Sequence, residues 1–268
     1  MSPKTMQPYI DANRLSWATL AEDHYHVFKR RLETEDTTLN PVQIAELGDI
    51  AGKSLIHLQC NTGADTLSLA RLGAQVTGVD LVPENIHFAK RMAQDLGFED
   101  AQFFTSNVLQ LMQNHHEQYD IVFTTEGLLC WLPDLDLWAR NLRHVLADYG
   151  FVYVMDGHPF FMVWDEEALP ELKVKYPYFQ KNTDEEDTIG GYAAPSRPGK
   201  NYSWMYTMGE IITALSEAGL HVEWLHEFDW LYYRCSAEHQ QRDNDGQWRY
   251  PEHRTQLPYT FSLKAGLR

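Results

Sequence analysis

The chain has 268 residues, 44% hydrophobic and 22% charged, a balance typical of a globular domain with a sizeable core. The formal net charge of −16 argues against a nucleic-acid partner, because no basic patch offsets it. Cys60, Cys130 and Cys235 are too scattered for a disulfide framework or a zinc site, and no run reaches the length of a transmembrane helix. A cytoplasmic protein with no membrane partner is therefore expected.

The first part of the chain predicts helices. Between residues 9 and 33, apolar side chains recur at steps of three and four, which predicts one amphipathic helix. Residues 41–48 predict a second, shorter helix, because Pro41 suits the first helical position.

The stretch 54–80 predicts a strand at 55–58, a tight turn, a helix, and a second strand at 76–79 that ends in Asp80. A turn that opens a helix points free N–H groups at a ligand, and Gly63 lets the backbone approach closely. A carboxylate at the end of the second strand can accept two hydrogen bonds from a ribose diol. An adenosine-containing ligand is therefore predicted here, with a ligand-free βαβ unit as the alternative.

The glycine pattern of this turn narrows the ligand. A dinucleotide fingerprint has three glycines, whereas this chain has Gln59, Asn61 and Gly63 at the three positions. The missing glycines argue against NAD, because its pyrophosphate needs the close approach that the second glycine allows.

Strands and helices alternate along the rest of the chain, which predicts a doubly wound α/β fold whose strand-end loops meet at one edge. The further predicted elements are a helix from Pro83 to Gly97, strands at 101–105, 119–123 and 151–156, a helix opened by Asp134 or Asp136, a helix opened by a Thr207–Glu210 capping box, and strands at 221–234 and 259–267.

The central stretch resembles the first two motifs of the class I S-adenosylmethionine-dependent methyltransferases, in particular a bacterial subgroup that keeps Leu-Gln-Cys at residues 58–60. The family's first motif places an acid before Gly-x-Gly-x-Gly, and here His57 stands in the acid's place. The resemblance implies a Rossmann-like sheet of seven mostly parallel strands with an antiparallel last strand. It also implies S-adenosyl-L-methionine as the cofactor and methyl transfer to a small-molecule substrate.

The resemblance further implies where the cofactor binds. In the family, an acid or Asn after the third strand meets the adenine amino group, which makes Asn107 and the following Val108 candidates. The family also carries an N-terminal helix that closes over the cofactor, so Trp17 is a candidate lid residue, with a core aromatic as the alternative. The predicted cofactor-binding residues are Trp17, His57, Gln59, Cys60, Asn61, Gly63, Asp80, Leu81, Asn107, Val108 and Thr125.

Methyl transfer requires the acceptor to be held close to the methyl group with water excluded, and a general base helps only if the acceptor arrives protonated. Glu126 follows the fourth strand and His158 follows the fifth, so these are the candidate catalytic residues. A hydrogen-bonded loop histidine is the alternative for His158. The adjacent His115 and His116 have no third ligand nearby, so no metal site is predicted.

Residues 159–205 interrupt the alternation with aromatic side chains among acidic, proline and glycine residues. We expect a lid that forms much of the pocket for a small apolar or aromatic metabolite, with a homodimer interface as the alternative. The candidate substrate-binding residues are Trp131, Phe160, Tyr202 and Trp204. The predicted domains are a helical cap (1–50), a cofactor-binding core (51–158 and 206–268) and this insertion (159–205).

Two other functions stay open from the sequence. The departures at His57, Gln59 and Asn61 allow a protein that binds S-adenosylmethionine without methyltransferase activity, as a sensor or regulatory partner. A protein methyltransferase is the other alternative, although the family's Asn/Asp-Pro-Pro-Tyr motif for amine methylation is replaced by Thr-Thr-Glu-Gly at residues 124–127.

Overall fold

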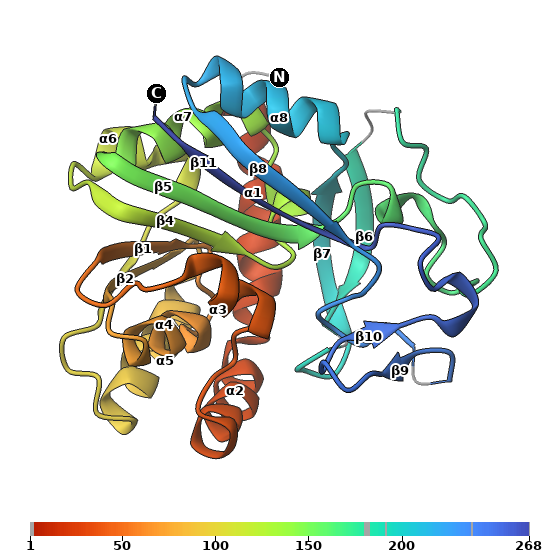
Figure 1. The fold of residues 1–268 in the computed structure, drawn as a ribbon, viewed down its shortest axis with the longest axis horizontal. Coiled ribbons are helices and arrows are strands. Elements are labelled where there is room, and N and C mark those ends of the chain that lie inside the picture. Colours follow the sequence, from red (N-terminus) through yellow and green to blue (C-terminus); the bar gives the residue numbers. More distant parts are fainter. Residues whose placement is uncertain (1–2, 180–182, 191, 237, 268) are drawn as a thin grey trace.

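The computed structural model describes residues 3–179, 183–190, 192–236 and 238–267 (Figure 1). In this part of the chain, a seven-stranded sheet has the order β3-β2-β1-β4-β5-β11-β8, and β11 is antiparallel to both of its neighbours. The predicted mostly parallel sheet with an antiparallel last strand is confirmed. Its strands are β1 (Ser54–Leu58), β2 (Gln75–Asp80), β3 (Gln102–Thr105), β4 (Tyr119–Thr125), β5 (Leu146–Gly157), β8 (His221–Phe228) and β11 (Thr260–Gly266).

Helices cover both faces of the sheet, which explains why every residue of β1 after Ser54 is buried. Leu55 is fully buried under one face and Ile56 under the other. None of the helices that the structure describes is long and apolar enough to cross a membrane. One face carries α6 (Leu111–Asn114), α7 (Leu135–Val145) and α8 (Met208–Glu217), and the other carries α2 (Ala21–Glu35), α3 (Pro41–Leu47), α4 (Ala64–Arg71) and α5 (Pro83–Asp95).

The helix starts follow the predicted capping chemistry. Asp134, rather than Asp136, caps α7, because its side chain accepts a hydrogen bond of 2.8 Å from the N–H of Leu137. The capping box of Thr207 and Glu210 opens α8 as predicted. Short 3-10 helices also occur among the described residues, at η1 (Val108–Gln110), η2 (Leu129–Trp131), η3 (Phe161–Val163) and η4 (Pro251–His253).

The prediction of one helix over residues 9–33 is wrong, because the chain forms α1 (Pro3–Ala18) and then α2. The break falls where Leu20 turns into a small apolar cluster with side chains of the insertion and becomes fully buried. The carbonyl oxygen of Thr19 accepts a hydrogen bond from the guanidinium of Arg197 instead of continuing a helix. Contacts with a distant segment therefore override the local helical periodicity.

The segment predicted as an insertion contains the hairpin of β6 (Thr183–Ile189) and β7 (Arg197–Trp204), while its residues 180–182 and 191 lie outside the described residues. Strand β7 packs along α1, where the side-chain amide of Asn13 donates to the carbonyl of Tyr202 (2.8 Å) and accepts from its N–H (2.7 Å). These paired bonds attach the hairpin to the N-terminal helix. The proposed division into cap, core and insertion stays a prediction.

Strand β8 ends at Phe228, whereas residue 234 was predicted. The chain beyond it pairs with another segment, because Leu231 exchanges hydrogen bonds of 2.8 and 3.1 Å with Trp248. That segment is the short hairpin of β9 (Gln241–Arg242) and β10 (Trp248–Arg249). Figure 1 shows both hairpins on one side of the molecule, beyond the carboxyl end of β5.

Candidate active site

The turn between β1 and α4 has left-handed backbone at alternate positions. The φ angle is +56° at Gln59, +50° at Asn61 and +81° at Gly63. This conformation costs roughly 1–2 kcal/mol for an L-residue and favours glycine. Gln59 and Asn61 thus adopt a glycine-like conformation at the two positions where the motif lacks its glycines.

Gly63 is required for packing. A Cβ atom at this position would lie 2.8 Å from the Phe103 ring and 2.9 Å from the Cβ of Ala89. The glycine therefore lets the start of α4 lie against β3 and α5. Among the predicted cofactor-binding residues, Gly63 is one that does not line the cavity described below.

The carboxylate of Asp80, at the end of β2, lies beside this turn. It accepts hydrogen bonds from the N–H of Asn61 (2.9 Å), the N–H of Val82 (2.9 Å) and the amide of Asn85 (3.1 Å). Burial raises the pKa of Asp80 to about 6, although each of these hydrogen bonds acts to lower it. Asp80 is a buried acceptor that also holds the turn in place.

A cavity of about 560 Å³ opens at the carboxyl ends of β1, β2, β4 and β5, a volume typical of small-molecule sites. This is the edge at which strand-end loops were predicted to meet. The predicted site residues in its wall are Trp17, His57, Gln59, Cys60, Asn61, Asp80, Leu81, Asn107, Val108, Thr125, Glu126, Trp131 and Trp204.

Several residues of this wall carry buried polar atoms without a hydrogen-bond partner in the described part of the chain. They are His57 Nε2, Gln59 Oε1, Thr62 Oγ1, Asn85 Oδ1 and Thr125 Oγ1. An unpaired buried polar atom is unfavourable, so their concentration here fits a polar ligand that supplies partners. His57 stays neutral, because burial lowers its pKa to about 3, and its Nδ1 lies 2.8 Å from Thr66 Oγ1.

Glu126, just past β4, has a left-handed backbone (φ +52°) and lines the cavity. Its Oε1 accepts a hydrogen bond of 3.1 Å from Gln43 Nε2. Burial raises the pKa of Glu126 well above its ordinary value, and the carboxylate of Asp65 raises it further. Once ionised, such a carboxylate is a better base than an ordinary glutamate.

The structure does not bring His158 into the cavity wall. Its Nε2 lies 2.8 Å from Glu227 Oε1, and its Nδ1 accepts a hydrogen bond from the N–H of Phe160. Glu227 belongs to β8, remote in sequence, so its pairing with His158 was not foreseeable. The geometry favours the alternative given above, a hydrogen-bonded loop histidine.

Two candidate substrate residues also lie outside the cavity wall. Phe160 packs edge-to-face on Trp164, with ring centroids 5.6 Å apart, and Tyr202 packs on Tyr9 at 4.6 Å. These aromatic rings of the insertion are used in packing. Trp204 does line the cavity, so the insertion contributes to its wall.

Sequence reasoning missed Asp156, a buried carboxylate near the end of β5 that lines the cavity. It accepts hydrogen bonds from the backbone N–H groups of Gly127 (2.7 Å), Leu128 (3.1 Å) and Leu129 (2.9 Å). These bonds hold the loop that follows Glu126. An acid at the end of the 151–156 strand was the signal that could have identified it.

Other residues in the wall were not among the predicted site residues, and helices and loops far apart in the chain bring them together. They are Arg14, Arg31, Asp65, Glu166, Tyr192, Tyr232 and Tyr233. Three of them are tyrosines, and the other four are two acidic and two basic residues.

Asp156→Ala is expected to lower the free energy of unfolding by about 2–4 kcal/mol, because it leaves several buried N–H groups unpaired. Urea denaturation measures this effect. The control is Asp148→Ala, at an exposed position of the same strand, which is expected to change stability by less than about 0.5 kcal/mol. Equal stability of the two variants would show that Asp156 does not hold the loop.

The seven-stranded sheet and the strand-end cavity have the fold that the resemblance to the class I S-adenosylmethionine-dependent methyltransferases implied. Residues 56–152 match the family model described as a methyltransferase domain. S-adenosylmethionine is the cofactor of this class.

Known proteins are similar over different shares of the chain. The ubiquinone biosynthesis O-methyltransferase of Salmonella paratyphi A is 32% identical over 127 residues, which are 46% of this chain and 49% of that protein. The chain thus matches about half the length of the curated relatives.

Solved structures are similar in fold over most of the chain. An S-adenosylmethionine dependent methyltransferase of Mesorhizobium loti has a TM-score of 0.63 and 17% identity, covering 84% of this chain and 95% of that chain. The DhpI-SAH complex has a TM-score of 0.56 and 17% identity, covering 97% of this chain and 98% of that chain.

Proposed function

We propose that this protein transfers a methyl group from S-adenosylmethionine to a hydroxyl group of a small apolar or aromatic molecule. The proposal rests on two carboxyl groups, those of Asp80 and Glu126, that line one cavity with aromatic walls. Burial raises the pKa of both. Asp80 suits a ribose diol, and Glu126 suits a protonated acceptor.

In the proposed cofactor half, Asp80 accepts hydrogen bonds from the ribose, and Asn107 lies in the same wall. The side chain of Asn107 also accepts from the N–H of Leu109 at 2.9 Å, which fixes its orientation. The unpaired His57 Nε2 and Thr125 Oγ1 offer partners to the polar end of the cofactor. These groups account for a polar ligand in this half.

In the proposed acceptor half, the ring of Trp131 packs edge-to-face on that of Trp17, a predicted cofactor-binding residue, with ring centroids 5.3 Å apart, and Tyr192 and Tyr232 also line the wall. When bound, S-adenosylmethionine supplies a methyl group on a positively charged sulfur. Aromatic faces attract positive charge, and apolar walls exclude water from the reacting atoms. These walls also favour an apolar or aromatic acceptor.

Glu126 is the proposed general base. A neutral hydroxyl is a poor nucleophile, so a carboxylate that takes its proton as the carbon–oxygen bond forms and the methyl–sulfur bond breaks assists the transfer. The Salmonella relative is named as an O-methyltransferase, which supports oxygen as the acceptor atom.

A turnover assay with methyl-labelled S-adenosylmethionine tests the proposal against matched phenols, aromatic amines and aromatic thiols. Labelling of phenols that depends on Glu126 is expected. Labelling of amines alone would overturn the choice of acceptor atom. Tight binding of S-adenosylhomocysteine by calorimetry, with no labelling of any acceptor class, would instead favour a protein that binds the cofactor without transferring its methyl group.

A further inference from the structure

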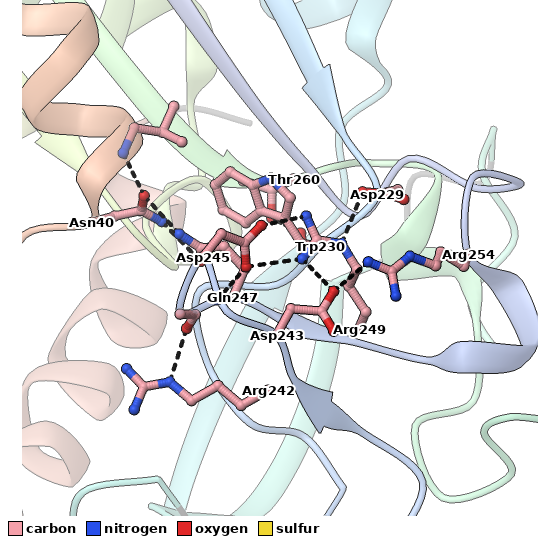
Figure 2. A network of polar contacts seen from close by, with 12 residues as sticks. Asn40, Asp229, Trp230, Arg242, Asp243, Asp245, Gln247, Arg249, Arg254 and Thr260 are labelled. Carbon is pink, nitrogen blue, oxygen red and sulfur yellow. Dashed lines mark hydrogen bonds and ion pairs between the residues drawn. The ribbon is translucent and has the colours of Figure 1, made fainter.

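The β9–β10 hairpin is held by a network of charged side chains (Figure 2). The guanidinium of Arg249, which is 8% exposed, bonds carboxylates of Asp229 (3.1 Å), Asp243 (2.9 Å) and Asp245 (3.0 Å). An arginine has five donors in a rigid fork, so one side chain can bridge several carboxylates at once. This bridging fixes the residues that flank the hairpin turn, including Gln247.

Gln247 joins the hairpin to a part of the chain 207 residues away (Figure 2). Its side-chain amide and that of Asn40 form a reciprocal pair, with N···O distances of 3.2 and 2.9 Å. Both side chains are buried, at 4% and 8% exposure. Each amide satisfies the other, so neither is free to rotate without leaving a buried polar atom unpaired.

Asn40 is the N-terminal cap of α3, and its own N–H donates to Gln43 Oε1 at 2.7 Å. A side-chain amide accepts at its oxygen and donates at its nitrogen, so this bond turns Gln43 Nε2 the other way. That nitrogen donates to Glu126 Oε1 at 3.1 Å, and Gln43 is only 1% exposed. The capping box of α3 thus determines which group of Gln43 faces Glu126.

We propose that Gln247, Asn40 and Gln43 form a relay of buried amides that positions the Glu126 carboxylate, with the β9–β10 hairpin as its anchor. The relay binds one oxygen of Glu126. Among the described residues, no hydrogen bond to its other oxygen is present, so that oxygen is left for the acceptor. The three amides are positioning residues, and their effect on catalysis rests on the proposed function.

Other groups also influence the charge of Glu126, and they are the same in each variant below. Asp65 and Asp156 disfavour the carboxylate form, and Arg31 favours it. Tyr153, Tyr192 and Tyr232 also lie within electrostatic range of Glu126. A change in the pKa of Glu126 that follows a substitution in the relay can therefore be assigned to the relay.

The test is the ionisation of Glu126, measured by NMR pH titration of the full chain with ¹³C-labelled glutamate and assigned with Glu126→Gln. Gln43→Met removes a hydrogen bond to the carboxylate form, so the pKa of Glu126 is expected to rise by about one unit or more. Gln247→Met, which frees the far end of the relay, is expected to raise it by a smaller amount. Gln94→Met, at an exposed position of α5, is the matched control and is expected to leave it unchanged.

Gln43→Glu separates positioning from helix capping. It keeps an acceptor for the N–H of Asn40 but replaces the donor toward Glu126, so it is expected to raise the pKa of Glu126 while α3 stays folded. An unchanged pKa in both Gln43 variants would overturn the proposal. If the pKa of Glu126 changes in the Gln43 variants but not in Gln247→Met, the relay is also overturned. In that case Gln43 would act on Glu126 without the β9–β10 hairpin.

Calorimetry with S-adenosylhomocysteine distinguishes a failure of the relay proposal from a failure of the proposed function. In the relay variants, the affinity is expected to stay within about twofold of the wild type, because none of the three amides contacts Asp80 or the turn. A wild-type protein that does not bind S-adenosylhomocysteine would contradict the proposed function, and the NMR titration would still decide whether the relay exists.

Discussion

Glu126→Gln is expected to lower kcat for methylation of a phenol by about 10²–10⁴-fold, because the amide cannot take the proton of the hydroxyl. The affinity for S-adenosylhomocysteine is expected to stay within about twofold, since the substitution keeps the size of the side chain. Single-turnover kinetics measure the first quantity and calorimetry the second. Loss of rate without loss of binding is the signature of a group that acts on the acceptor.

The pH dependence of the rate gives a second measure of the same residue. Burial raises the pKa of Glu126, and only its ionised form can act as a base, so the rate is expected to rise with pH through that raised value. The matched control is Glu99→Gln, at an exposed position, which is expected to leave the profile unchanged. A Glu126→Gln variant that keeps full activity would show that the acceptor needs no base here.

Asp80→Asn is expected to weaken the binding of S-adenosylhomocysteine by about 10²-fold or more. Hydrogen bonds to a charged acceptor contribute about 1.5–3 kcal/mol each, and the ribose diol would donate two of them. Asn keeps one acceptor oxygen but lacks the charge. Asp100→Asn, at an exposed position, is the control in the same calorimetric titration.

The raised pKa of Asp80 also predicts a pH dependence. In the free protein, a carboxyl group whose pKa is raised to about 6 contributes stability below its ordinary pKa, and that contribution is lost as the pH rises through about 6. Cofactor binding is expected to have the opposite pH dependence, because the ribose would donate hydrogen bonds to the ionised form of Asp80. The affinity of the wild type is therefore expected to fall as the pH is lowered through about 6, and that of Asp80→Asn is expected not to follow. A pH-independent wild-type affinity would contradict the ribose contact.

Local pattern was sufficient for the central part of the fold. The stretch 54–80 combines two apolar runs of strand length with a helical pattern between them, so its strand–helix–strand structure and the place of Asp80 could be predicted. Capping chemistry predicted the start of α8 for the same reason, since Thr207 and Glu210 lie three residues apart. Interactions between residues only a few positions apart can be predicted from the sequence.

Long-range contacts account for what could not be predicted. The break at Leu20 depends on Arg197, which lies 178 residues beyond Thr19, and no local signal announces it. Gln43 reads as an ordinary helix residue, and only the fold brings Glu126, 83 residues away, to its side chain. His158 was a plausible catalytic histidine until β8 placed Glu227 against it.

The left-handed turn has a consequence for how the two substrates bind. Gln59 and Asn61 have side chains that glycine lacks, and these side chains bond the turn to neighbouring parts of the chain. The Gln59 amide donates to the carbonyl of Leu128 at 3.3 Å, and the Asn61 amide lies 3.1 Å from His24 Nδ1 in α2. A shift of the turn when one substrate binds would therefore also move the loop after Glu126 and the N-terminal helices. We therefore expect the two substrates to bind cooperatively, and by thermodynamic reciprocity each would change the dissociation constant of the other by the same factor.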